Sequence, residues 1–207
     1  MINKIVFENV SHSFANKKIF ENFSIELDAG KIIAITGANG SGKSTFLKLA
    51  GQFIKPDTGK IIAFDDGKII DKINLRKKIS AVAPNMNLYS ELTAFENIKF
   101  FVRLRDIVLN DTDEFFKRVE LDIETKNKSV KNFSTGMIQR LKFLILLAID
   151  SDVWILDEPC SNLDDSGKNI FLKEIKNSAQ IGKLILMATN ERDEAKIANE
   201  IISLPIH

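Results

Sequence analysis

Residues 37–45 read Gly37-Ala38-Asn39-Gly40-Ser41-Gly42-Lys43-Ser44-Thr45. They follow an apolar, strand-like run at 31–36 and precede a helical pattern that begins at Phe46. This is the pattern G-x-x-x-x-G-K-[ST] in the strand–loop–helix setting of a phosphate-binding loop. Its glycines let backbone N–H groups approach phosphates closely, and the helix N-terminus adds a favourable dipole. We expect Lys43 to contact the β- and γ-phosphates of a nucleotide, and the Ser44 hydroxyl to ligate Mg²⁺.

The simpler interpretation of the same residues is a glycine-rich turn without a ligand. Gly37, Gly42, Lys43 and Ser44 all fall at the positions that the pattern requires, and a third glycine and a threonine accompany them. This register favours a nucleotide-binding loop over an ordinary turn.

The composition excludes several classes of function. The chain has 207 residues, of which 44% are hydrophobic, enough for one or at most two domains with a full core. A net charge of +1 gives no electrostatic reason to expect a nucleic acid as partner. The single cysteine, Cys160, cannot form an internal disulfide and suits a reducing cytoplasm. The apolar run at 143–149 is far shorter than the roughly 20 residues of a membrane span, so we expect any membrane role to need a second chain.

Strand patterns alternate with helix patterns along most of the chain. The expected strands are 2–8, 23–28, 31–36, 60–64, 79–83, 153–156, 183–189 and 200–204. The expected helices are 43–52, 92–121, 135–150, 165–179 and 191–199. This alternation predicts an α/β fold with a mostly parallel core sheet. The β-rich beginning of the chain predicts a small antiparallel subdomain beside it.

The chain is expected to be a single domain made of parts that are discontinuous in sequence. About 85–150 supplies only helices, which predicts a helical subdomain inserted into the sheet. About 1–84 and 151–207 then form the nucleotide-binding core together with the β subdomain.

Two adjacent acids end the apolar strand at 153–156. Carboxylates are ligands that Mg²⁺ prefers, so Asp157 can orient the metal, and Glu158 can act as the general base that polarises an attacking water. Two acids after a strand can also merely begin a turn. The phosphate-binding loop upstream in the same chain favours the functional interpretation.

A third motif, Phe133-Ser134-Thr135-Gly136-Met137, opens the helical pattern at 135–150. Taken alone, Ser134 is best explained as an ordinary N-cap. With all three motifs in this order, however, the chain resembles the nucleotide-binding domain of ATP-binding cassette (ABC) proteins, over residues 3–204. The third motif, followed by Gln139 and Arg140, is then similar to the family's LSGGQ signature.

The resemblance assigns further residues to the nucleotide site. Residues 37–45 and 153–158 look like the family's Walker A and Walker B motifs. Ser134 and Gly136 are expected to contact the γ-phosphate held by a partner cassette. Asp164, in the D-loop-like stretch 161–164, is expected at the nucleotide, and Phe14 lies where a family aromatic stacks on adenine.

Two residues depart from the family pattern. Asn85 stands where the family has its Q-loop glutamine, which touches Mg²⁺ and the attacking water. Asn190 stands where the family has its switch histidine, which contacts the γ-phosphate. Asn85 keeps an amide with one methylene less, and Asn190 donates a hydrogen bond but cannot carry a positive charge. Because Asp157 and Glu158 are intact, we expect hydrolysis to persist at a reduced rate.

The resemblance implies a function that depends on other chains. Two cassettes, expected to be copies of this chain, would dimerise head to tail around two ATP molecules and Mg²⁺. A separate integral-membrane transporter subunit would bind the groove around 85–95 and hold the chain at the inner, cytoplasmic face of the cell membrane. No nucleic acid is expected as partner.

Three alternatives remain open. A soluble regulatory or mechanical cassette usually has two cassettes in one chain or a long coiled-coil insertion, and neither occurs here. An ATP-gated module with little hydrolysis is suggested by Asn85 and Asn190. A small-molecule phosphotransferase would leave residues 134–137 without a role. The transported substrate leaves no signal in the sequence.

Overall fold

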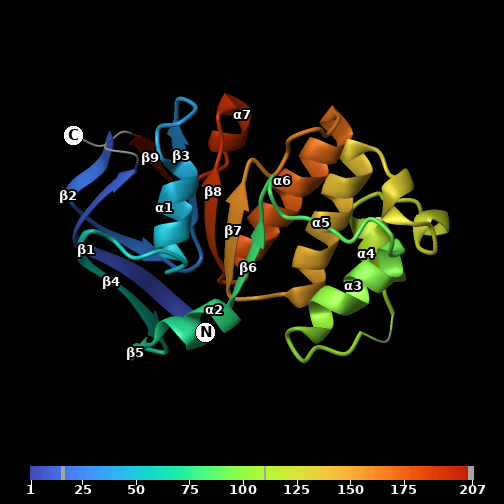
Figure 1. Ribbon diagram of the computed structural model, residues 1–207, viewed down its shortest axis with the longest axis horizontal. Coiled ribbons are helices and arrows are strands. Elements are labelled where there is room, and N and C mark those ends of the chain that lie inside the picture. Colours follow the sequence, from blue (N-terminus) through green and yellow to red (C-terminus); the bar gives the residue numbers. More distant parts are fainter. Residues whose placement is uncertain (15–16, 110, 205–207) are drawn as a thin grey trace. The chain divides into compact units, whose positions relative to one another are not determined.

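The structure is a computed structural model that describes residues 1–14, 17–109 and 111–204 (Figure 1). It consists of two compact units, each discontinuous in sequence. The first comprises Met1–Ile79, Ser151–Glu158 and Ile175–His207, and the second comprises Ser80–Asp150 and Pro159–Glu174. The chain passes between them in strand β6 (Ile79–Val82), after Asp150, after Glu158, and within helix α6 (Asp165–Gln180).

The first unit begins with an antiparallel sheet whose strand order is β2-β1-β4-β5 (Figure 1). Its strands are β1 (Ile2–Phe14), β2 (Lys17–Asp28), β4 (Thr58–Asp65) and β5 (Lys68–Ile70). Strands β1 and β2 are longer than the sequence predicts. Their register shifts near Asn9 and Asn22, which both have a φ of 49°. Such bulges interrupt the two-residue alternation from which strands are predicted.

The same unit contains parallel strands in the order β7-β8-β3-β9. They are β3 (Ile32–Gly37), β7 (Val153–Asp157), β8 (Leu184–Ala188) and β9 (Glu200–Leu204). Their apolar residues are almost all buried, as expected for parallel strands. Asp157 and Ile35 both pair with Ala188, one from each side. The carboxyl ends of β7 and β3 therefore lie on either side of β8 at one edge of the sheet.

Helix α1 (Lys43–Ala50) packs into a core that both sheets share. The Phe46 ring stacks on Phe7 with centroids 5.1 Å apart and meets Phe20 edge-on at 5.8 Å. Ile33 and Leu186 of the parallel strands belong to the same core. Because α1 is held by both sheets, the loop at its N-terminus has a fixed support.

Short helix α2 (Lys72–Lys77), also in the first unit, was not predicted from the sequence. The carboxylate of Asp71 caps it by accepting hydrogen bonds from the N–H groups of Ile73 and Asn74. Helix α7 (Arg192–Ala195) is much shorter than the helix expected at 191–199. After it, the Asn199 side chain accepts a hydrogen bond from Ile32 N at the start of β3, which favours an extended connection over more helix.

The second unit is helical. Helix α5 (Thr135–Ile149) lies beside α3 (Ala94–Arg103) and α4 (Asp113–Arg118) (Figure 1). Single turns of 3₁₀-helix occur at Ile123–Thr125 and Val130–Asn132. The rings of Phe143 on α5 and Phe171 on α6 stack with centroids 3.9 Å apart. The unit thus has its own aromatic core.

The single helix expected at 92–121 is wrong, because the structure separates α3 from α4. Thr93 and Glu96 form a capping box that starts α3. Asp106, with a φ of 57°, then turns the chain out of the helix, and the β-branched Ile107 and Val108 follow. The α/β fold class with its antiparallel and helical parts is confirmed. Within the ranges that the structure describes, no helix is long and apolar enough to cross a bilayer.

Candidate nucleotide site

The loop between β3 and α1 requires glycine at two positions. Gly37 has a φ of 143° and Gly42 a φ of 106°, which side-chain-bearing residues rarely adopt. A Cβ on Gly42 would lie 2.3 Å from Ile19 Cγ2, and one on Gly37 would lie 2.5 Å from the carbonyl oxygen of Leu204. The backbone of the loop is therefore packed closely against its surroundings, and its outer side is exposed at Ala38, Asn39 and Gly40.

The Lys43 side chain is buried beneath this loop. Its Nζ donates hydrogen bonds to the carbonyl oxygens of Gly37 and Ala38, at 2.9 and 3.2 Å. The Ser41 hydroxyl is also buried, and within the described part of the chain it has no hydrogen-bond partner. An ammonium group and an unsatisfied hydroxyl at the N-terminus of a helix suit a phosphate group.

The two expected metal ligands meet at the same edge of the sheet. Ser44 Oγ donates a hydrogen bond to Asp157 Oδ2 at 2.6 Å, so the loop and the end of β7 are in direct contact. Among the residues that the structure describes, no group of three or more His, Cys, Asp or Glu side chains could hold a metal by itself. A hydroxyl and a carboxylate do suit Mg²⁺ when phosphate oxygens and water complete its coordination. Thr45 follows Ser44 in the first turn of α1.

Glu158 lies next to Asp157 on a strained backbone. Its φ is 50°, and its N–H donates to the carbonyl oxygen of Ala188 at 2.9 Å. Asn190 Nδ2 approaches Glu158 Oε1 at 3.4 Å, which is a long hydrogen bond. The same Nδ2 donates to Asn39 Oδ1 at 2.7 Å. Residues from the loops after β3, β7 and β8 therefore meet here, and strained backbone is often found at functional sites.

Other predicted residues lie in the second unit. Asn85 is exposed, just after β6, in a turn where Met86 N donates to the carbonyl oxygen of Ala83 at 3.0 Å. Ser134 caps α5, and its Oγ accepts a hydrogen bond from Met137 N at 3.2 Å. Ser134 is therefore an N-cap, as expected from its local sequence. It is also exposed, so its hydroxyl is accessible to a ligand.

Gly136 lies against the segment that follows Walker B, and Asp164 belongs to that segment. A Cβ on Gly136 would lie 3.0 Å from the carbonyl oxygen of Asn162. The Asp164 carboxylate accepts hydrogen bonds from Gly167 N at 3.0 Å and from Arg140 Nη2 at 2.9 Å. The Gly167 N–H, followed by the Arg140 guanidinium, lowers the pKa of Asp164 below its usual value, so this carboxylate is ionised at neutral pH. Phe14 ends β1, and its side chain lies outside the described part of the structure.

Two contacts could not be predicted from the motifs. One is the hydrogen bond between Asn39 and Asn190, which are 151 positions apart in the sequence. The other involves Lys142 of α5, whose Nζ donates to the carbonyl oxygens of Ala83 and Pro84. The sequence indicates only that Lys142 is unusual, because it is the single charged residue in the otherwise apolar run 141–149.

Known proteins share both the sequence pattern and the fold. The family model described as ABC transporter matches residues 20–161. The chain belongs to the ABC transporter family. The energy-coupling factor transporter ATP-binding protein of Fusobacterium nucleatum is 32% identical over 204 residues, which are 95% of this chain and 77% of that protein. The ergothioneine transport ATP-binding protein of Helicobacter pylori is 28% identical over 207 residues, or 97% of this chain and 96% of that protein.

A solved structure agrees with this membership of the ABC transporter family. A dimeric bacterial ABC transporter cassette superposes with a TM-score of 0.83 at 25% identity, covering 97% of this chain and 94% of that one. The resemblance to the ABC nucleotide-binding domain is thus confirmed. Members of this family bind and hydrolyse ATP, so the chain is an ATPase cassette.

Proposed function

We propose that this chain is the ATP-hydrolysing subunit of an ABC transporter, which dimerises on ATP and drives a separate membrane subunit. One observation carries the proposal: the buried Lys43, the Ser44–Asp157 contact and Glu158 lie together at one edge of the parallel sheet. The relatives named above are themselves transport ATP-binding proteins, and the matches cover nearly all of this chain. A soluble regulatory cassette has no comparable support.

Each residue at this edge has a distinct role in hydrolysis. Lys43 gives up its hydrogen bonds to the loop carbonyls and binds the β- and γ-phosphates, while Ser44 and Asp157 would hold Mg²⁺. The metal, when bound, supplies positive charge that offsets charge on the phosphates. Glu158 accepts a proton from the attacking water as it bonds to the γ-phosphorus and the bond to ADP breaks. Asn190 contributes a neutral donor on the γ-phosphate side.

The remaining motif residues act on nucleotide within this chain or in a second copy of it. Asn85 would offer its exposed amide to Mg²⁺ and to the attacking water. Ser134 and Gly136, at the N-terminus of α5, contact the γ-phosphate bound by the partner cassette, where the helix dipole favours negative charge. Asp164 takes part at the dimer interface, and Phe14 stacks on adenine. The second cassette is a copy of this chain, and each copy folds as one ATPase domain.

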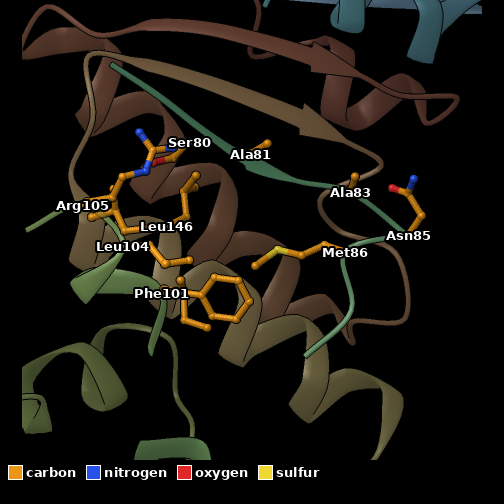
Figure 2. Close-up of a pocket in the computed structure, with 11 residues that line it drawn as sticks. Ser80, Ala81, Ala83, Asn85, Met86, Phe101, Leu104, Arg105 and Leu146 are labelled. Atoms are coloured by element: carbon orange, nitrogen blue, oxygen red, sulfur yellow. The ribbon is translucent and has the colours of Figure 1, made fainter. Parts of the chain in front are cut away.

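The membrane subunit binds a pocket within the second unit. This pocket has a volume of about 340 Å³, and Asn85 and Met86 are among the residues that line it. Figure 2 shows Met86, Phe101 and Leu104 gathered in the middle of the view, with Asn85 and Arg105 toward opposite sides. Leu104 lines this pocket and is 64% exposed, so it leaves apolar surface open to a partner.

A helix of the membrane subunit with an apolar face would suit this pocket. Its apolar residues would cover Leu104 and Phe101. This contact would hold the chain at the cytoplasmic face of the cell membrane. It would also place the membrane subunit next to Asn85.

Membrane fractionation of cells tests this function. We expect the wild-type chain in the membrane fraction and Leu104→Asp in the soluble fraction, because a carboxylate would face the apolar helix. Ile69→Asp is the matched control, since Ile69 is an exposed apolar residue of the first unit, at 68%. Equal thermal unfolding midpoints would show that both variants fold. Retention of a folded Leu104→Asp variant at the wild-type level would contradict the proposed docking.

A further inference from the structure

Lys142 places a charge inside an apolar helix. It lies two turns after Ser134 on α5, and only 6% of its surface is exposed. The neighbouring residues from Leu141 to Ala148 are buried as well. An ammonium without a polar partner is costly to bury, so a lysine at this position requires acceptors for its hydrogens.

The acceptors are carbonyl oxygens of the segment that leads to Asn85. Lys142 Nζ donates to Ala83 O at 3.2 Å and to Pro84 O at 3.3 Å. Figure 2 shows Ala83 and Asn85 along the chain as it leaves β6. Burial lowers the pKa of Lys142 from its ordinary value, but the two carbonyl dipoles favour the charged form. Lys142 thereby fixes the backbone immediately before Asn85.

The same turn of α5 also contacts two other loops of the second unit. Gln139 Nε2 donates to the carbonyl oxygen of Pro159 at 2.6 Å. Arg140 Nη2 donates to Asp164 Oδ1 at 2.9 Å. Three side chains between positions 139 and 142 therefore connect one helix to the segments that contain Asn85, Pro159 and Asp164.

We propose that Lys142 is a positioning residue for Asn85, and that it couples the position of α5 to the position of that amide. The proposal rests on the proposed function, in which the Asn85 amide serves Mg²⁺ and the attacking water and Ser134 contacts the partner's nucleotide. Because a helix is stiff along its axis, a displacement of Ser134 displaces Lys142 too. The carbonyl oxygens of Ala83 and Pro84 then follow, and Asn85 moves with them. Binding of the partner cassette at the start of α5 is thereby transmitted to the catalytic amide.

Amide hydrogen exchange of the nucleotide-free protein tests the contact without any ATPase assay. Lys142→Met keeps an unbranched apolar stem but removes the donors, so the amide of Met86, which donates to the carbonyl oxygen of Ala83, should exchange about tenfold faster. Lys173→Met, at an exposed position of α6 in the same unit, should leave this exchange rate unchanged. Lys142→Gln retains an N–H donor and serves as the second variant, with an intermediate rate expected. Unchanged exchange of the Met86 amide in a folded Lys142→Met variant would overturn the proposal.

A double-mutant cycle tests whether Lys142 acts through Asn85. We expect Lys142→Met to lower kcat about tenfold with KM nearly constant, because the contact positions a group on the γ-phosphate side. In the Asn85→Ala background the same substitution should change kcat by less than about twofold. An equal loss in both backgrounds would show a purely structural role and overturn the proposal. If even the wild-type chain releases no phosphate from ATP, the proposed function fails, and hydrogen exchange alone decides the role of Lys142.

Discussion

Replacing Asn190 by histidine should raise kcat with little change in KM. The Asn190 amide gives its short hydrogen bond, at 2.7 Å, to the neutral Asn39 side chain, and reaches Glu158 only at 3.4 Å. An imidazole extends farther from the backbone and can carry a positive charge. A well-placed donor to a developing charge contributes roughly 10²–10³ in rate, and the amide already supplies part of this. We therefore expect a gain of about tenfold, which corresponds to about 1.4 kcal/mol of activation free energy.

Steady-state phosphate release at saturating Mg-ATP measures this effect. Asn190→Ala is the control, because it removes both hydrogen bonds without adding a new donor and should be slower than wild type. Combining Asn190→His with Asn39→Ala shows whether the Asn39 side chain restrains the new imidazole. If Asn190→His is slower than wild type, asparagine is the better catalytic residue at this position. The interpretation of Asn190 as a less effective replacement for the family's switch histidine would then be wrong.

Three other substitutions test separate parts of the structure. Lys43→Ala should abolish tight ATP binding in a titration with fluorescent ATP, and unchanged affinity in a folded variant would refute the role of Lys43. Asn85→Gln restores the longer amide and should raise kcat by less than Asn190→His does. A fall in kcat would argue against the role of Asn85 at Mg²⁺ and the attacking water. Phe171→Ala removes a ring stacked 3.9 Å from Phe143 and should cost about 3–5 kcal/mol of unfolding free energy in urea titrations, whereas a cost below about 1 kcal/mol would contradict this packing.

The phosphate-binding loop could be predicted because its chemistry is local. Its glycines, lysine and serine are neighbours in sequence, and the apolar strand before them has a clear pattern. The same is true of Asp157 and Glu158, which end a buried strand. Where the determinants are adjacent residues, the sequence is sufficient to predict the element and its chemistry.

Other features depend on residues that are distant in sequence or on backbone geometry. The break between α3 and α4 follows from the left-handed turn at Asp106, which helical periodicity does not reveal. Strand β1 continues past its bulge at Asn9 only because β2 and β4 pair with it. The contact of Asn190 with Asn39 can be predicted only when the order of strands in the sheet is known. Such features need the three-dimensional structure because no local pattern encodes them.

The central claim is that this chain is an ATPase cassette that closes as a dimer around ATP. Glu158→Gln removes the general base but leaves Lys43, Ser44 and Asp157 in place, so ATP should bind without being hydrolysed. Size-exclusion chromatography with light scattering on this variant in Mg-ATP is the most direct test. We predict a dimer with ATP, a monomer without it, and no phosphate release. A variant that remains monomeric in Mg-ATP and hydrolyses it at the wild-type rate would contradict the account.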